Sequence, residues 1–110
     1  MSVILAITTC PDEPTAQQIA ATLVQERLAA CVNRVAGVTS TYFWDGRLQD
    51  DVEILLIIKT SAARVEALTA RLKTLHPYDL PELVVLPVSG GNEAYLQWVR
   101  EGVEQERRSE

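Results

Sequence analysis

The sequence has few cysteines and a deficit of positive charge. Its 110 residues include two cysteines, Cys10 and Cys31, which do not form a Cys-x-x-Cys motif. We therefore expect no disulfide framework and interpret both as free thiols of a cytoplasmic protein. Lys and Arg number 10 against 15 Asp and Glu, which gives a net charge of −5. Scattered positive charges in an acidic chain argue against a nucleic-acid partner.

The sequence also lacks a long hydrophobic run. The apolar stretch from Val3 to Ile7 has no basic segment before it and is too short for the core of a signal peptide. No stretch approaches the length that spans a membrane. The composition, 47% hydrophobic and 23% charged, is typical of a globular protein. We predict one soluble domain over residues 1–110, with no membrane partner and with a charged tail, residues 104–110, that frays.

The dipeptide Asp45-Gly46 separates two long strand-like segments and predicts a hairpin from Val32 to Lys59. Asp-Gly favours a type I′ turn because both central residues of that turn need a positive φ. Each arm then has about thirteen residues, or roughly 43 Å at ~3.3 Å per residue, more than twice a typical strand. The hairpin should therefore project beyond the body of the domain. The predicted pairs are Trp44 with Arg47, Tyr42 with Gln49, Thr39 with Val52 and Gly37 with Ile54.

The other segments alternate between apolar strands and amphipathic helices. Asp12 is expected to cap a helix that continues to about Leu28, and Thr60-Ser61 a second helix that ends at His76 before a proline. Asn92 is expected to cap a last helix. Further strands are predicted at residues 3–7 and 82–86. The resulting order is β-α-β-β-α-β plus a C-terminal helix, the ferredoxin-like arrangement of the α+β class.

This topology leaves one face of the sheet uncovered. Right-handed crossovers place both main helices on the same face. The run from Ile54 to Ile58 is apolar without alternation, which is typical of a strand that is covered on both faces. One C-terminal helix cannot cover the whole second face, and an apolar face of that size indicates a partner. The simplest partner is another copy of the chain, so we predict a homo-oligomer.

His76, Cys10 and Glu82 are the candidate metal ligands, because the topology brings them to one end of the sheet. Imidazole and thiolate suit copper or zinc, but a structural zinc site needs four firm nitrogen or sulfur ligands. A metal site would thus be open, weak or shared between subunits. Two alternatives remain: His76 serves only as a polar cap of its helix, or it acts as a base for a Cys10 nucleophile, for which no orienting motif is present.

Aromatic residues near the tip of the hairpin form a second candidate site. A monomer would seldom expose Tyr42 and Trp44, so we interpret them as interface anchors or as the wall of a pocket between subunits. Tyr78 belongs to the same end of the sheet. Lys59, at the end of the buried strand, either pairs with a carboxylate or receives an anion.

Several motifs, in the right order along almost the whole chain, resemble the CutA divalent-cation tolerance family. The resemblance implies a ferredoxin-like subunit in a tight homotrimer, similar in architecture to PII signalling proteins, and a cytoplasmic protein that is linked to tolerance of divalent metals and in some members binds copper. No catalytic activity follows from it. The motifs are Glu26-Arg27-Leu28-Ala29-Ala30-Cys31-Val32-Asn33, Gly37-Val38-Thr39-Ser40, Tyr42-Phe43-Trp44-Asp45-Gly46, Lys59-Thr60, His76-Pro77-Tyr78, Pro81-Glu82 and Asn92-Glu93-Ala94-Tyr95-Leu96-Gln97-Trp98.

The metal residues that the resemblance implies are present only in part. The histidine before Pro-Tyr is His76. Copper-binding members carry a cysteine at the position of Thr8 and a second histidine at the position of Leu75. Cys10 follows Thr8 by two residues and, by strand alternation, lies on the same side of the strand.

Three functions are consistent with these observations. The leading hypothesis is a non-enzymatic homotrimer that requires no cofactor and binds Cu(II) or another divalent cation near His76. The second is a PII-like signalling or scaffold protein that accepts a small anion or a partner segment between subunits, using Lys59, Trp44 and the Gly90-Gly91 loop. The third is a thiol enzyme that uses Cys10.

Overall fold

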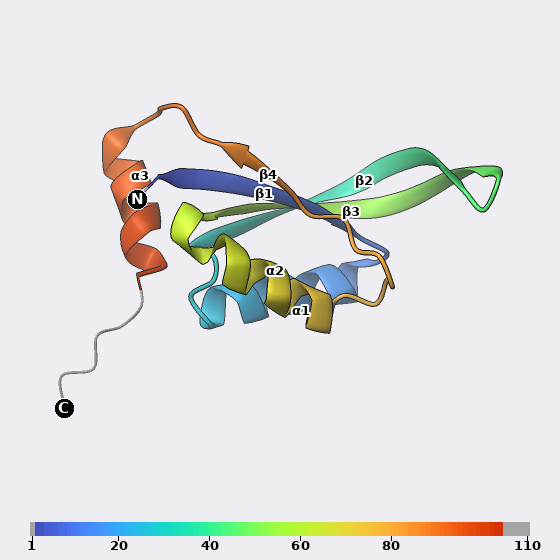
Figure 1. The fold of residues 1–110 in the computed structure, drawn as a ribbon, viewed down its shortest axis with the longest axis horizontal. Coiled ribbons are helices and arrows are strands. Elements are labelled where there is room, and N and C mark those ends of the chain that lie inside the picture. Colours follow the sequence, from blue (N-terminus) through green and yellow to red (C-terminus); the bar gives the residue numbers. More distant parts are fainter. Residues whose placement is uncertain (1, 105–110) are drawn as a thin grey trace.

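A computed structural model describes residues 2–104 and shows an α+β fold with one four-stranded antiparallel sheet (Figure 1). The strand order is β2-β3-β1-β4. Helices α1 and α2 lie against one face of the sheet, and α3 lies at the end that is remote from the hairpin tip. The elements are β1 (Val3–Cys10), α1 (Glu13–Gln25), β2 (Cys31–Trp44), β3 (Arg47–Ser61), the 3₁₀ turn η1 (Ala62–Arg64), α2 (Val65–Leu75), β4 (Val84–Pro87) and α3 (Glu93–Gly102).

The hairpin of β2 and β3 has the predicted turn. Asp45 and Gly46 have φ values of 55° and 75°, as a type I′ turn requires. The predicted pairs Trp44–Arg47, Tyr42–Gln49 and Thr39–Val52 are all confirmed. Figure 1 shows the two strands extending well beyond the helices. We call this projecting part, residues 38–53, the ribbon.

The predicted pair Gly37–Ile54 is wrong, because a β-bulge interrupts the ladder there. Val35 pairs with Leu55 and Val38 with Glu53, so two residues of β2 lie opposite one residue of β3. Gly37 has a φ of 76°, a conformation that costs glycine little and other residues more. Beyond the bulge the register is shifted by one residue, so that Cys31 pairs with Lys59. The bulge therefore decides which β2 side chains share a face with which β3 side chains.

The helix ends follow local hydrogen bonding. The Asp12 side chain accepts from the backbone N–H of Thr15, and Asn92 accepts from that of Ala94, so both predicted caps are confirmed. Helix α1 ends at Gln25, three residues before the expected end. Ser61 makes no capping hydrogen bond, and Thr60 is a buried strand residue, so the predicted Thr60-Ser61 cap is wrong. The chain instead enters α2 through the 3₁₀ turn. Strand β4 begins at Val84 rather than at residue 82.

The hydrophobic core lies between the sheet and helices α1 and α2. Strands β1 and β3 alternate, so that Ala6 and Leu56 point to the helices with no exposed surface. The helices contribute apolar positions one turn apart, which is the amphipathic pattern that the sequence predicted. The fully or nearly fully buried helix residues are Ala16, Ile19, Leu23, Leu68 and Leu72.

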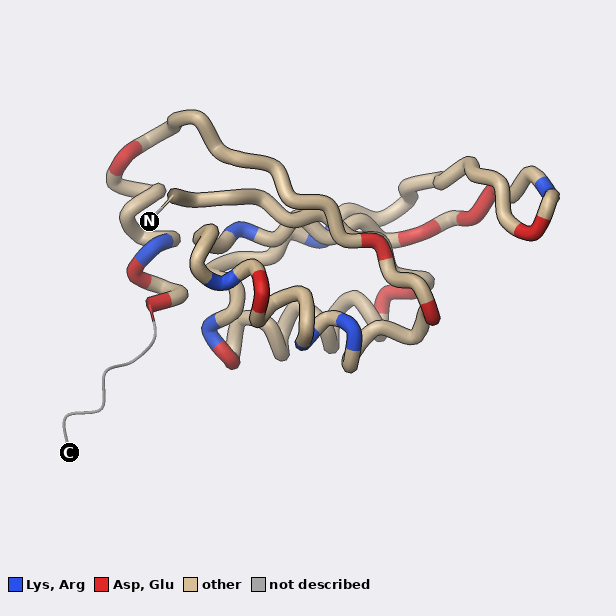
Figure 2. Tube along the Cα trace, viewed as in Figure 1, with Lys and Arg blue, Asp and Glu red and all other residues tan. Residues whose placement is uncertain are grey.

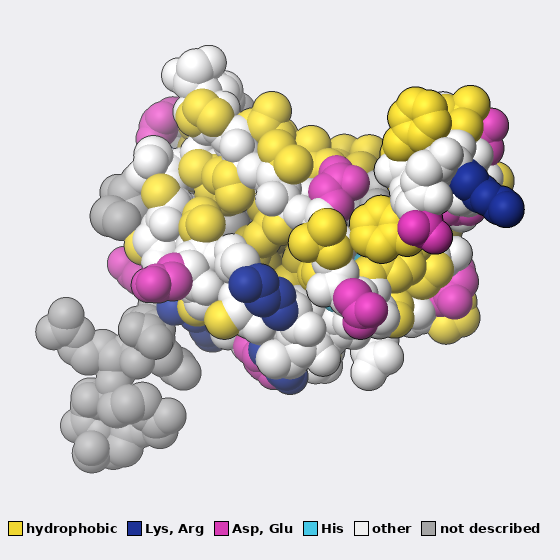
Figure 3. All heavy atoms as spheres, turned by 45° about the vertical axis from the view of Figure 1, so that its right-hand side comes forward, with side chains coloured by type: hydrophobic (Ala, Val, Ile, Leu, Met, Phe, Trp, Pro, Cys, Tyr) yellow, Lys and Arg dark blue, Asp and Glu magenta, His cyan; other side chains and the backbone are white. Residues whose placement is uncertain are grey.

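The opposite face of the sheet, which we call the open face, is apolar and only partly covered. Its exposed residues include Val35, Val84 and Leu86, with exposed fractions of 40%, 52% and 40%. Helix α3 covers the end where Val99 and Val103 are buried. Hydrophobic side chains gather over much of the surface in Figure 3. The register places Leu5, Ile7, Leu55, Ile57, Val84 and Leu86 on the open face.

Candidate functional site

Thr9, near the end of β1, connects two of the predicted metal residues. The Nε2 atom of His76 lies 2.7 Å from the backbone carbonyl oxygen of Thr9, and Thr9 Oγ1 donates to Glu82 Oε1 at 3.4 Å. The backbone N–H of Tyr78 donates to Nδ1 of His76 at 3.2 Å. Because a carbonyl oxygen only accepts, Nε2 donates to Thr9, while Nδ1 is the acceptor for the Tyr78 N–H. His76 thus holds β1 to the segment that leads to β4.

Cys10 does not share this environment. It has no exposed surface and belongs to the hydrophobic core beneath the sheet, on the side of β1 opposite to Thr9. Burial, assisted by the negative charges of Glu53 and Asp12, raises the pKa of the Cys10 thiol to about 11. The thiol is therefore protonated at neutral pH, which is unfavourable for a nucleophile or a metal-bound thiolate.

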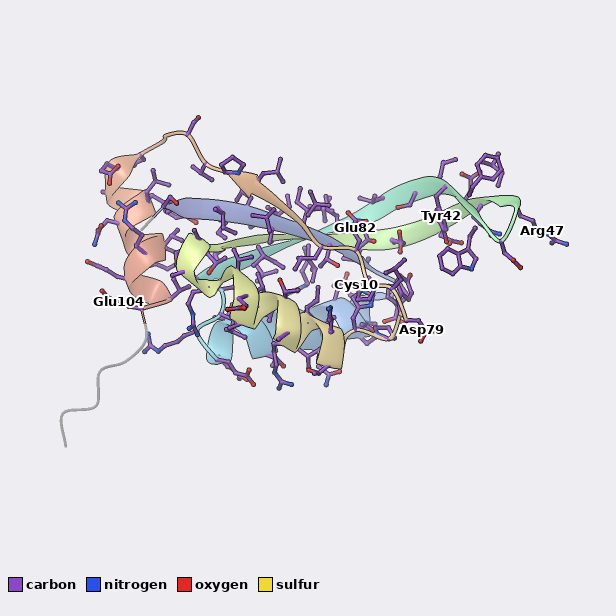
Figure 4. All side chains as sticks on the ribbon, in the orientation of Figure 1. Cys10, Tyr42, Arg47, Asp79, Glu82 and Glu104 are labelled. Carbon is purple, nitrogen blue, oxygen red and sulfur yellow. The ribbon has the colours of Figure 1, made fainter. Side chains whose placement is uncertain are left out.

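A cavity of about 510 Å³ lies between the ribbon and the segment that joins α2 to β4. Figure 4 shows Tyr42 on the ribbon, and Asp79 and Glu82 on the joining segment. We call it the ribbon cavity. It is lined by Thr9, Ser40, Thr41, Tyr42, Trp44, Glu53, Tyr78, Asp79, Leu80 and Glu82.

Glu53 is the buried carboxylate of the ribbon cavity. Only 6% of the residue is exposed, although it lies in the ribbon, and the hydroxyl of Tyr78 donates to its Oε2 atom at 2.8 Å. None of the ion pairs within residues 2–104 includes Glu53. Burial, together with the hydrogen bond to this carboxylate, raises the pKa of Tyr78 far above its usual value. Tyr78 thus remains a hydrogen-bond donor to Glu53 throughout the physiological pH range.

Two further aromatic residues line the ribbon cavity. The hydroxyl of Tyr42 donates to Asp51, and this hydrogen bond raises the pKa of Tyr42. Trp44 is 58% exposed, which is unusual for such a large ring. Acidic residues follow the same part of the chain in Figure 2, and Figure 4 labels Arg47 at the tip of the hairpin. The cavity therefore combines aromatic rings with negative charge, and within residues 2–104 no Lys or Arg lines it.

Lys59 lies away from the ribbon cavity. It pairs with Cys31 in the sheet, beside α3, where its Nζ atom donates to Tyr95 Oη at 3.4 Å and lies 5.4 Å from the ring centroid. Of the four predicted pocket residues, the structure thus brings together Tyr42, Trp44 and Tyr78 and places Lys59 elsewhere.

The predicted metal residues do not form a complete coordination shell. Within the part of the chain that the structure describes, no three His, Cys, Asp or Glu side chains are placed to hold a metal ion. His76 uses both ring nitrogens for hydrogen bonds, and Cys10 is protonated in the core. These donors do not fit a tightly bound resident metal. A site made of His76, Cys10 and Glu82 stays a prediction.

Comparison with known proteins identifies the family. The model of the CutA1 divalent ion tolerance protein family matches residues 4–102. The chain belongs to this family. It is 48% identical to human Protein CutA over 103 residues, which are 94% of this chain and 58% of the human protein. It thus spans little more than half the length of this curated relative.

No helix within residues 2–104 has the length and apolar character needed to cross a membrane.

Solved structures of CutA proteins have the same fold. The crystal structure of CutA from Xylella fastidiosa superimposes with a TM-score of 0.92 at 47% identity, covering 94% of this chain and all of that one. The protein from Archaeoglobus fulgidus, described as a periplasmic divalent cation tolerance protein, gives a TM-score of 0.88 at 29% identity and covers 93% of this chain and 99% of that one. The predicted ferredoxin-like α+β fold is thereby confirmed.

Sequence reasoning missed Thr9 and Glu53 as cavity residues. The signal for Glu53 was its position directly before the apolar run of β3, which places a carboxylate next to a buried part of the strand. The signal for Thr9 was strand alternation, which puts it opposite the core side of Cys10.

Proposed function

We propose that the chain works as a non-enzymatic homotrimer in the tolerance of divalent cations. The open face supports assembly, because Val35, Val84 and Leu86 on it remain 40%, 52% and 40% exposed within residues 2–104. The ribbon supports it too, since Phe43, Leu48 and Val52 are 74%, 65% and 67% exposed. Side chains of this kind are stabilised when a neighbouring copy covers them.

We further propose that Cu(II) or a related divalent ion is an exchangeable ligand rather than a resident cofactor. His76 and Glu82 both contact Thr9, so an imidazole and a carboxylate lie close together at the end of β1. Only Nδ1 of His76 has a lone pair for a metal, and it now accepts the Tyr78 N–H. Binding must therefore displace one backbone hydrogen bond, which favours weak and reversible uptake. Cys10 would join only after leaving the core.

Calorimetric titration of Cu(II) tests this proposal. We expect saturable binding to the wild type and at least tenfold weaker binding to His76→Asn, which keeps a polar side chain at the helix end but removes the only imidazole of the chain. Glu66→Gln, on the exposed side of α2, is the matched control for the loss of a distant polar group. Identical isotherms for wild type and His76→Asn would show that His76 is not a Cu(II) ligand.

A second candidate function is ligand binding in a PII-like trimer, and the ribbon cavity favours it. A volume of about 510 Å³ lies within the range of small-molecule sites. Tyr42, Trp44 and Tyr78 would face a neighbouring copy if ribbons extend onto adjacent subunits. A thermal-shift screen of metabolites in which nothing stabilises the protein would contradict this function.

We place the protein in the cytoplasm. Cys10 and Cys31 are both free, as expected in a reducing compartment. Fractionation of cells that express the full-length protein tests this assignment, and recovery with periplasmic markers would overturn it.

A further inference from the structure

We propose that the ribbon cavity binds an organic cation, a primary ammonium or guanidinium group on a short apolar stem. The inference builds on the second candidate function, ligand binding in this cavity, and specifies the chemical class of the ligand. It does not require Cu(II) binding at His76, although Thr9 and Glu82 belong to the surroundings of both sites.

The first argument is the charge of the cavity. Three carboxylates line it, from Glu53 on β3 and from Asp79 and Glu82 on the joining segment. No Lys or Arg of residues 2–104 lines it. A small anion would therefore meet only negative charge, whereas a cation would be attracted from every side. The anion site predicted around Lys59 and the Gly90-Gly91 loop is a different site, because neither lines this cavity.

The second argument is the state of Glu53. The residue is more than nine-tenths buried and lines the cavity, and among residues 2–104 its only side-chain partner is the Tyr78 hydroxyl on Oε2. The other oxygen, Oε1, is not among the fully buried polar atoms without a partner, which within residues 2–104 are the hydroxyls of Thr8 and Thr60, so it is not sealed from solvent. A buried carboxylate is costly unless it is paired. An ammonium group in the cavity would bring Glu53 an opposite charge and a charge-assisted hydrogen bond, neither of which the ion pairs of residues 2–104 give it.

The third argument is the chemistry of the walls. Tyr42, Trp44 and Tyr78 line the same cavity as these carboxylates, and the faces of aromatic rings attract cations. The rings and Leu80 also give apolar surface to an alkyl stem. A bare divalent ion would use neither feature, because it prefers a shell of oxygen, nitrogen or sulfur ligands. The cavity is also far larger than one ion needs.

The experiment compares three probes of similar length, of which one is a cation, one is neutral and one is an anion. n-Butylammonium, n-butanol and n-butyrate are titrated into the Trp98→Phe protein, in which Trp44 is the only tryptophan, and Trp44 fluorescence reports occupancy. We expect saturable quenching by butylammonium, at least tenfold weaker binding of butanol and no binding of butyrate. Equal affinities for the three probes, or a preference for butyrate, would overturn the cation assignment while leaving ligand binding in the cavity intact.

Variants locate the binding. Glu53→Gln should weaken butylammonium at least tenfold, whereas Glu66→Gln, which removes the same charge from the exposed side of α2, should leave it unchanged. Equal weakening by both variants would show that only the net charge matters and would refute the site. If Glu53→Gln does not fold, the three-probe series in the Trp98→Phe protein decides alone. Displacement of butylammonium by Cu(II) that depends on Glu53 rather than on His76 would assign the cavity to the metal and overturn the proposal.

Discussion

A charge on the open face should dissolve the trimer and leave the subunit folded. We choose Leu86→Glu, because Leu86 lies on β4 beside Leu5 and is 40% exposed in the single chain. The matched control is Val24→Glu, an equally exposed apolar residue, at 42%, on α1. Both variants add one carboxylate to a partly exposed apolar position, but only the first lies on the proposed interface.

The magnitude follows from burial. Full burial of a leucine side chain stabilises by about 1.5–3 kcal/mol, so covering the exposed 40% contributes about 1 kcal/mol per subunit. Burying an unpaired carboxylate costs several kcal/mol more for each ion. Three equivalent positions in a trimer multiply both effects, so the free energy of assembly falls by roughly 10 kcal/mol or more. At ~1.4 kcal/mol per factor of ten, the association constant of the proposed trimer falls by about seven orders of magnitude.

Sedimentation velocity at several protein concentrations measures the outcome. We expect a trimer for the wild type and for Val24→Glu, and a monomer with helical circular dichroism for Leu86→Glu. If Leu86→Glu sediments like the wild type, the open face is not the interface. If the wild type is itself a compact monomer when dilute, the proposed assembly is wrong.

Three further predictions concern single groups. Thr8→Val should stabilise the fold by about 1 kcal/mol in urea unfolding, because the Thr8 hydroxyl is buried without a hydrogen-bond partner; no gain would mean that it has one. Iodoacetamide near neutral pH should label Cys31 first and Cys10 only after unfolding, as mass spectrometry can show; fast labelling of Cys10 would revive a thiol enzyme. Hydrogen bonding to Thr15 lowers the pKa of Asp12, so the cap stabilises above the unfolded pKa and its contribution is lost as pH falls through the folded one. The urea midpoint of Asp12→Ala should therefore lie below that of the wild type near neutral pH and coincide with it near about pH 2, and an equal difference at both pH values would contradict this.

The sequence was sufficient for the elements that local chemistry determines. The Asp45-Gly46 turn fixed the ribbon register, and the Asp12 and Asn92 side chains fixed two helix starts. The bulge at Gly37 was not predictable from pairing alone, because a glycine in a strand is equally compatible with an unbroken ladder.

The candidate site was predicted only in part, because its contacts join residues that are far apart in the sequence. Topology brought His76, Tyr78 and Glu82 to one end of the sheet, and the structure agrees. Cys10 was grouped with them because it lies at the same end of β1. It shares the core face of that strand with Thr8, and the sequence alone does not say which face the helices cover. The hydrogen bond between Glu53 and Tyr78 joins residues 25 positions apart. It depends on the distance between the joining segment and the ribbon, which no local pattern determines.

The ribbon makes hydrogen exchange a direct measure of self-association. Residues 38–53 pack on neither α1 nor α2, so in a lone subunit their amides are protected only by the two-stranded ladder and exchange through local opening. Amides of β1 exchange only when the core opens. On dilution, the ribbon amides should therefore lose their protection against hydrogen exchange while the β1 amides keep theirs. The protein concentration at which the ribbon amides have lost half of this protection marks the dissociation midpoint.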